Sequence, residues 1–116
     1  KLNVSVASHS KVMNSTIEEF KKELDKINIS MPKSNIIQNV NNRAPKNIDD
    51  LKENLLNQLI YPVQWSNTMK SINKYNGIII ECGPSKVLSG IAKSNDMNNV
   101  YSTSSETFME DIKGIL

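Results

Sequence analysis

The chain has 116 residues but only one cysteine, one histidine and few aromatic side chains, which make up 5% of it. A lone Cys82 excludes an internal disulfide and any metal site built from several cysteines. No apolar run is long enough to span a bilayer, and no signal peptide is recognisable. We therefore expect a cytoplasmic protein, in which the thiol stays reduced.

Charge is moderate and nearly balanced. Charged residues make up 22% of the chain, and the net charge is only +2. Without a dense cluster of lysine and arginine, this balance argues against a nucleic-acid partner. All but one of the 14 basic residues are lysines, so Arg43 is the only guanidinium that could clamp a carboxylate or phosphate in a bidentate way. A hydrophobic content of 38% and the length of one ordinary domain are typical of a globular chain with its own core.

Hydrophobic patterning predicts strands that alternate with helices. Strand-like patterns cover residues 2–6, 35–40, 78–82 and 100–103. Apolar residues recur at helical spacing over residues 13–27, 51–59, 65–75, 87–91 and 108–115. This order predicts an α/β fold, with a layered, mostly parallel sheet and flanking helices. The continuous apolar strand 78–82 suits the middle of such a sheet, whose active crevice lies at the C-terminal strand ends.

Local signals mark where several of these helices begin and end. Residues 15–18 could form a capping box, although this helix could also begin earlier, near Ser10. Asn47 is placed to cap the helix that ends before Tyr61-Pro62. Gly77 is placed as a C-cap and Ser85 as an N-cap. Each of these assignments predicts a specific hydrogen bond or backbone conformation.

His9 follows the first predicted strand, where a side chain would project from the edge of a sheet. Imidazole is the one side chain that ordinarily takes and returns a proton near neutral pH. An isolated histidine is more often a cap or core residue, so the pattern alone leaves both interpretations open.

A nucleophile is harder to find. Ser85 lies in a strand-turn-helix segment, but a nucleophile elbow needs a second glycine where Val87 stands. Cys82 ends an apolar strand, which favours a buried, inert thiol. Pro84 removes a backbone donor from the turn that might have held a phosphate. By themselves, the residues provide a candidate base without a partner.

Four segments stand in a fixed order along the chain: Val4-Ser5-Val6-Ala7-Ser8-His9, Ile37-Gln38-Asn39-Val40, Gln58-Leu59-Ile60-Tyr61-Pro62-Val63-Gln64-Trp65, and Glu81-Cys82-Gly83-Pro84-Ser85-Lys86-Val87-Leu88-Ser89-Gly90. In this order and spacing they resemble malonyl-CoA:acyl-carrier-protein transacylase. The likeness spans nearly the whole chain but only the C-terminal part of that enzyme. It implies that residues 1–116 are a single partial domain, the C-terminal portion of the α/β-hydrolase-like large subdomain. Residues 1–9 would then be the strand that leads into the catalytic histidine.

The resemblance also implies a reaction and the residues that perform it. In this family a serine takes malonate from coenzyme A and passes it to the phosphopantetheine thiol of acyl carrier protein. His9 would be the acid–base catalyst, oriented by the backbone carbonyl at or near Gln58. Ser8 and Asn39 would line the site. Only the substrates, malonyl-CoA and holo-acyl carrier protein, would be needed, with no metal or other cofactor.

Several family features have no counterpart here. The elbow serine, the oxyanion loop and the arginine that holds malonate belong to the upstream part of the enzyme. We therefore expect a fragment that is inactive alone and needs that N-terminal part. Arg43 does not match the malonate clamp, and we interpret it as a surface residue. Ser8 stands where many relatives carry phenylalanine, which leaves acyl selectivity open.

The partners follow from the same resemblance. Lys86 and Lys93 are the best candidates to meet an acidic carrier protein. Two other functions stay open: the acyltransferase domain of a polyketide synthase, using a larger extender, and a non-catalytic α/β remnant that binds a partner. Membrane and nucleic acid are not expected among the partners.

Overall fold

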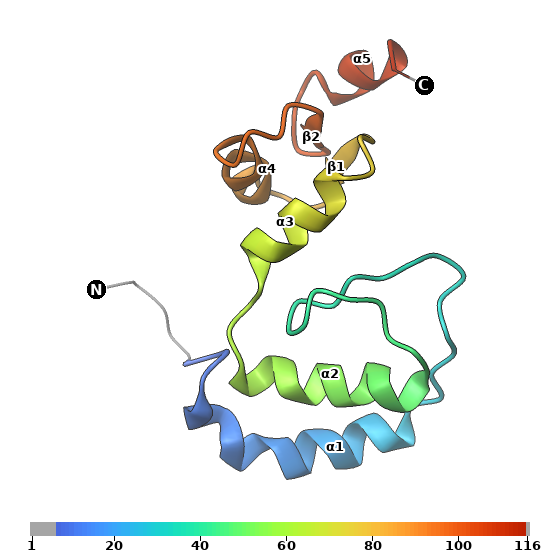
Figure 1. The fold of residues 1–116 in the computed structure, drawn as a ribbon, viewed down its shortest axis with the longest axis vertical. Helices are drawn as coiled ribbons and strands as arrows, with labels where there is room; N and C mark the ends of the chain where they lie inside the picture. The colour runs from blue at the N-terminus through green and yellow to red at the C-terminus, as the bar shows by residue number, and fades with distance from the viewer. Residues whose placement is uncertain (1–6, 116) are drawn as a thin grey trace. The chain divides into compact units, whose positions relative to one another are not determined.

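The computed structural model describes residues 7–115, which form two compact units (Figure 1). The first extends to Thr68 and the second begins at Met69. The predicted strand over residues 2–6 lies outside the described residues. The single partial domain over residues 1–116 stays a prediction.

The first unit is built on two helices that lie side by side, drawn blue and green in Figure 1. A 3₁₀ helix, η1 (Lys11–Thr16), leads into α1 (Ile17–Lys26), and α2 (Ile48–Ile60) follows a long connection. Leu24 of α1 and Leu51 of α2 are buried. Lys52 and Asp25 form an ion pair of 3.1 Å between the two helices. Leu24 is thus the buried apolar residue of α1 and Leu51 that of α2, and the other leucines of α2 are half-buried.

The helix boundaries confirm some of the predicted signals. Asn47 caps α2, since its Oδ1 accepts a hydrogen bond of 2.8 Å from the backbone N–H of Asp50. The same helix ends at Ile60, as the following Tyr61-Pro62 pair predicts. The capping box at 15–18 is wrong. Thr16 Oγ1 instead donates to the carbonyl of Met13, a bond that belongs to the preceding 3₁₀ turns.

The strand predicted at 35–40 is also wrong. Of that segment only Gln38 pairs, in an isolated antiparallel bridge to Arg43. The chain between them turns tightly, with Asn42 in the left-handed region at φ 55°. Asparagine tolerates this region and favours turns, so a run of asparagines ends the extended backbone that the isoleucines favour.

The second unit contains a short parallel βαβ arrangement. Helix α3 (Trp65–Asn73) crosses the boundary between the units and is followed by β1 (Ile79–Glu81), α4 (Val87–Lys93), β2 (Val100–Ser102) and α5 (Phe108–Lys113). β1 and β2 pair in parallel, with Ile79 opposite Val100 and Glu81 opposite Ser102. The alternation of strands and helices is confirmed here. Within residues 7–115 the sheet has these two strands, and Ile80 in β1 is 42% exposed.

The caps predicted in this unit are wrong. Gly77 is not a left-handed C-cap, because α3 ends at Asn73 and the left-handed residue is Asn76, at φ 47°. Ser85 is not the N-cap of α4. The N-cap is Lys86, whose side chain makes no capping hydrogen bond. None of the helices between residues 7 and 115 is long and apolar enough to cross a membrane.

Candidate active site

His9 lies in an exposed turn directly before η1, and its backbone is in the left-handed region at φ 59°. Ser10 Oγ closes this turn by donating to the carbonyl of Ala7 at 2.7 Å. Residues other than glycine rarely adopt this conformation, and strained residues concentrate at active sites and ligand clamps. Ser8, the neighbouring residue, is exposed.

The imidazole of His9 contacts the last turn of α2. Its Nδ1 lies 2.7 Å from the carbonyl oxygen of Gln58, 49 residues further along the chain. A carbonyl can only accept, so Nδ1 carries the proton in this hydrogen bond. In the neutral ring Nε2 then keeps its lone pair and is free to accept a proton. The structure thus brings together the two residues that the resemblance pairs.

Gln58 lies in the last turn of α2. The last carbonyls of a helix lack partners within the helix and carry the negative end of its dipole. The Gln58 carbonyl is one of these last carbonyls, and it accepts from His9 Nδ1 instead.

A buried network of amides holds the 38–43 turn against α2. Asn54 is 4% exposed; its Nδ2 donates to Gln38 Oε1, and its Oδ1 accepts from Asn41 Nδ2, both at 2.7 Å. Gln38 Nε2 in turn donates to the carbonyl of Leu51 at 3.2 Å. The predicted site residue Asn39 is half-buried in this turn, where its carbonyl accepts from Gln64 N–H at 2.7 Å. These bonds fix the turn relative to the helix that carries Gln58.

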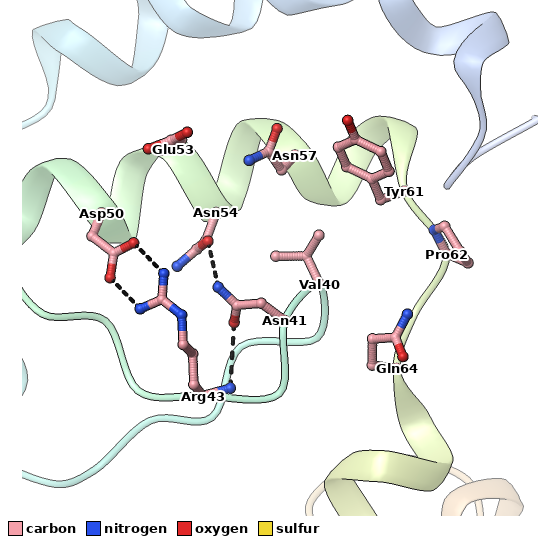
Figure 2. Close-up of a pocket in the computed structure, with 10 residues that line it drawn as sticks. All are labelled: Val40, Asn41, Arg43, Asp50, Glu53, Asn54, Asn57, Tyr61, Pro62 and Gln64. Atoms are coloured by element: carbon pink, nitrogen blue, oxygen red, sulfur yellow. Dashed lines mark hydrogen bonds and ion pairs between the residues drawn. The ribbon is translucent and has the colours of Figure 1, made fainter.

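Between this turn and α2 lies a cavity of about 510 Å³ (Figure 2). Asn57, which precedes Gln58 on α2, and Tyr61, which follows the end of the helix, line it. Arg43 and Asp50 face each other at its edge, with bidentate contacts of 2.6 and 2.7 Å. Arg43 is exposed, as predicted for a surface residue, and Asp50 already occupies its guanidinium.

This ion pair shifts the protonation of both groups. The Arg43 guanidinium, helped by the backbone N–H of Lys46, lowers the pKa of Asp50 to about 2. The hydrogen bond to Asp50 raises the pKa of Arg43. The Arg43 guanidinium is therefore engaged by a carboxylate that stays ionised.

Comparison with known proteins decides the family. No family model matches the chain. A malonyl CoA-acyl carrier protein transacylase of Staphylococcus aureus is 35% identical over 114 residues, which are 97% of this chain and 36% of that protein. The crystal structure of FabD from Acinetobacter baumannii matches 98% of this chain with 37% of its own, at 36% identity and a TM-score of 0.88. The chain belongs to the malonyl CoA-acyl carrier protein transacylase family.

The extent of the match is as informative as its strength. The chain spans about a third of the length of the curated transacylases it matches. A further solved structure, a malonyl-transacylase in complex with a type II polyketide acyl-carrier protein, matches 97% of this chain with 38% of its own, at 25% identity and a TM-score of 0.84. The likeness to transacylase structures confirms the α/β class with parallel strands. The place within an α/β-hydrolase-like large subdomain stays a prediction.

The second unit corrects what the sequence suggested for the other candidate nucleophiles. Cys82 is exposed, so the prediction of a buried thiol is wrong. Side chains alternate along β1, and Glu81 rather than Cys82 faces α4, where its carboxylate bonds Ser89. Ser85 contributes its carbonyl, which accepts from Ser102 Oγ at 3.0 Å. Among residues 7–115, no three His, Cys, Asp or Glu side chains group in a way that could hold a metal ion.

The buried amides and Glu81 were not identified from the sequence. One signal was available: Asn54 stands three residues after Leu51, on the buried side of an otherwise leucine-rich helix. A polar residue there needs hydrogen-bond partners. Glu81 had a comparable signal, because it interrupts an apolar strand just before a helix N-terminus.

Proposed function

We propose that the protein containing these residues transfers malonyl from coenzyme A to the phosphopantetheine thiol of acyl carrier protein, with His9 as its acid–base catalyst. The observation that carries the proposal is the 2.7 Å contact between His9 Nδ1 and the Gln58 carbonyl. It lies within a chain about a third identical to named transacylases. The proton on Nδ1 leaves Nε2 as the basic atom.

The reaction needs one base that works in both directions. His9 Nε2 takes the proton of a serine hydroxyl, supplied outside these 116 residues, as its oxygen attacks the thioester carbonyl. The C–S bond breaks, and His9 returns the proton to the departing coenzyme A thiolate, which leaves a malonyl ester. In the second half, His9 takes the proton of the carrier thiol, the sulfur attacks the ester, and the serine oxygen regains its proton.

The Gln58 carbonyl supports each of these proton transfers. It fixes the orientation of the ring and the proton on Nδ1, so that Nε2 faces each proton transfer as the basic atom. A neutral carbonyl cannot take the proton itself. The ring therefore returns to the same tautomer after each half-reaction.

Partners and substrates follow from the family. Acyl carrier proteins are acidic, and the exposed Lys86 and Lys93 at the two ends of α4 offer positive charge to such a partner. One matching structure is itself a malonyl-transacylase with an acyl-carrier protein. We further propose that malonyl-CoA and the holo carrier protein suffice without a metal or other cofactor, that the protein is cytoplasmic, and that Ser8 and Asn39 line the acyl site.

A chimera tests the proposal directly. These 116 residues replace the matching third of the S. aureus transacylase, and malonyl transfer from malonyl-CoA to holo-acyl carrier protein is measured. We expect an active chimera, in which His9→Ala lowers kcat roughly 10²–10⁴-fold, the usual scale for loss of a general acid–base. Lys11→Ala, an exposed change two residues away, is the matched control and should keep the parental rate.

The outcomes separate the alternatives. A folded chimera without transfer, or one whose rate does not depend on His9, contradicts the proposal and favours a non-catalytic remnant that binds a partner. Preference for methylmalonyl-CoA over malonyl-CoA favours the acyltransferase of a polyketide synthase. Malonyl transfer by the 116-residue chain alone would contradict the external serine and make the exposed Cys82 the first nucleophile to test.

A further inference from the structure

The contact between His9 and Gln58 depends on how α2 ends. In an α-helix each carbonyl accepts from the backbone N–H four residues later. The Asn57 carbonyl still does so, accepting from Tyr61 N–H at 2.9 Å. The next donor in the series, for the Gln58 carbonyl, would be residue 62. That residue is Pro62, which has no N–H.

Pro62 also controls the backbone before it. The ring of a proline clashes with a helical conformation at the preceding residue and pushes it towards extended values. Tyr61 has φ −106° and ψ 150°, which is extended, and α2 stops at Ile60. Beyond the proline, Gln64 N–H donates to the Asn39 carbonyl at 2.7 Å, so the departing chain is held by the 38–43 turn. The space over the Gln58 carbonyl is thereby left for the imidazole.

We propose that Pro62 is a positioning residue for His9, which rests on the proposed function of His9 as the acid–base catalyst. By withholding an N–H and keeping Tyr61 extended, Pro62 prevents a further helical turn from taking the Gln58 carbonyl. The carbonyl then accepts from His9 Nδ1 and sets the tautomer that leaves Nε2 basic. Pro62 itself is exposed, so its replacement opens no cavity in a core.

Two substitutions at this position separate positioning from simple rigidity. Pro62→Ala and Pro62→Gly both restore the N–H, but alanine favours an extra helical turn whereas glycine does not. In the chimera we expect Pro62→Ala to lower kcat roughly tenfold, with KM for malonyl-CoA nearly unchanged. The reason is that a displaced catalytic group slows the chemical step. Pro62→Gly should lose clearly less.

A merely structural role predicts the reverse order. Glycine gives the unfolded chain more conformational entropy than alanine does. If Pro62 only made the chain rigid, Pro62→Gly would therefore have the lower kcat of the two variants. Pro32→Ala, the same chemical change in the connection between α1 and the Gln38–Arg43 bridge, is the control and should keep the parental kcat. A Pro62→Ala chimera as fast as its parent, or a Pro62→Gly chimera as slow as Pro62→Ala, would overturn the inference.

A spectroscopic measurement tests the same inference without activity. His9 is the only histidine, so the ¹⁵N signals of its ring in the 116-residue chain need no assignment by mutation. At about pH 9, where an ordinary imidazole is neutral, we expect Nδ1 to be the protonated nitrogen. In Pro62→Ala the signals should shift towards the Nε2–H tautomer that free imidazole side chains prefer, and in Pro32→Ala they should not.

The two readouts keep the proposals apart. If His9→Ala leaves the chimera active but Pro62→Ala still changes the tautomer, the proposed function fails and the positioning of the ring stands. If His9→Ala abolishes transfer but neither Pro62 variant changes the tautomer or kcat, the positioning role fails alone.

Discussion

Glu81, the last residue of β1, holds Ser89 of α4 through two hydrogen bonds. Its Oε2 accepts from the Ser89 backbone N–H at 2.8 Å and from Ser89 Oγ at 2.6 Å. Its Oε1 accepts from the N–H of Leu88 at 3.1 Å. The hydroxyl of Ser89 and these two backbone donors lower the pKa of Glu81, against the opposing effect of its burial. The carboxylate therefore does the capping that Ser85 was expected to do.

Glu81→Gln should lower the melting temperature at neutral pH by several degrees, because the amide places N–H donors opposite the donors of Ser89 and Leu88. A carboxylate whose pKa is lowered in the folded state stabilises the fold at pH values above its ordinary pKa. This contribution is lost as the pH falls through the folded-state pKa. The gap between the two melting curves, followed by circular dichroism, should therefore close in acid. Glu106→Gln, an exposed change, is the control. Equal melting temperatures at all pH values would contradict the prediction.

Asp50 should titrate near its lowered pKa of about 2. It stabilises the fold at pH above the ordinary aspartate value of about 4, and this contribution is lost between about pH 4 and pH 2. In Arg43→Lys the Asp50 pKa should rise towards the ordinary value, because an ammonium cannot reproduce the bidentate contact. A ¹³C NMR titration of the carboxyl measures both. An unchanged Asp50 pKa in Arg43→Lys would refute the ion-pair explanation.

Asn54→Ala should destabilise the chain by about 1–3 kcal/mol, because it leaves Gln38 Oε1 and Asn41 Nδ2 without their partner in a buried setting. Urea unfolding measures the change. Asn57→Ala, one turn further along the same helix and only half-buried, should cost distinctly less. Similar losses for the two variants would show that the amide network is not what holds the 38–43 turn.

Gln58→Ala in the chimera should lower kcat by less than about tenfold, whereas His9→Ala lowers it roughly 10²–10⁴-fold. The reason is that His9 bonds to the main-chain carbonyl of residue 58, which alanine keeps. Malonyl transfer under saturating malonyl-CoA makes the comparison. A loss in Gln58→Ala as large as in His9→Ala would mean that the glutamine side chain, not its carbonyl, matters for the reaction.

The parts of the fold that the sequence predicted are those set by local chemistry. Asn47 caps α2 and Pro62 terminates it, since each acts through backbone atoms within a few residues. Two of the errors have a different cause. The cap at Ser85 and the burial of Cys82 depended on which partner each segment meets, whereas the strand predicted at 35–40 ends at a local turn that contains Asn42. Periodicity describes one segment at a time and carries no information about that partner.

The candidate site likewise has features that the sequence predicts and features that only the tertiary structure shows. The sequence singled out His9 as the only imidazole and, through the resemblance, paired it with the carbonyl near Gln58. It also contains the proline that removes the competing N–H. Only the tertiary structure brought Nδ1 within 2.7 Å of a carbonyl 49 residues away and joined Gln38, Asn41 and Asn54 in one network. Local preferences decide where a helix ends, but long-range packing decides what lies against that end.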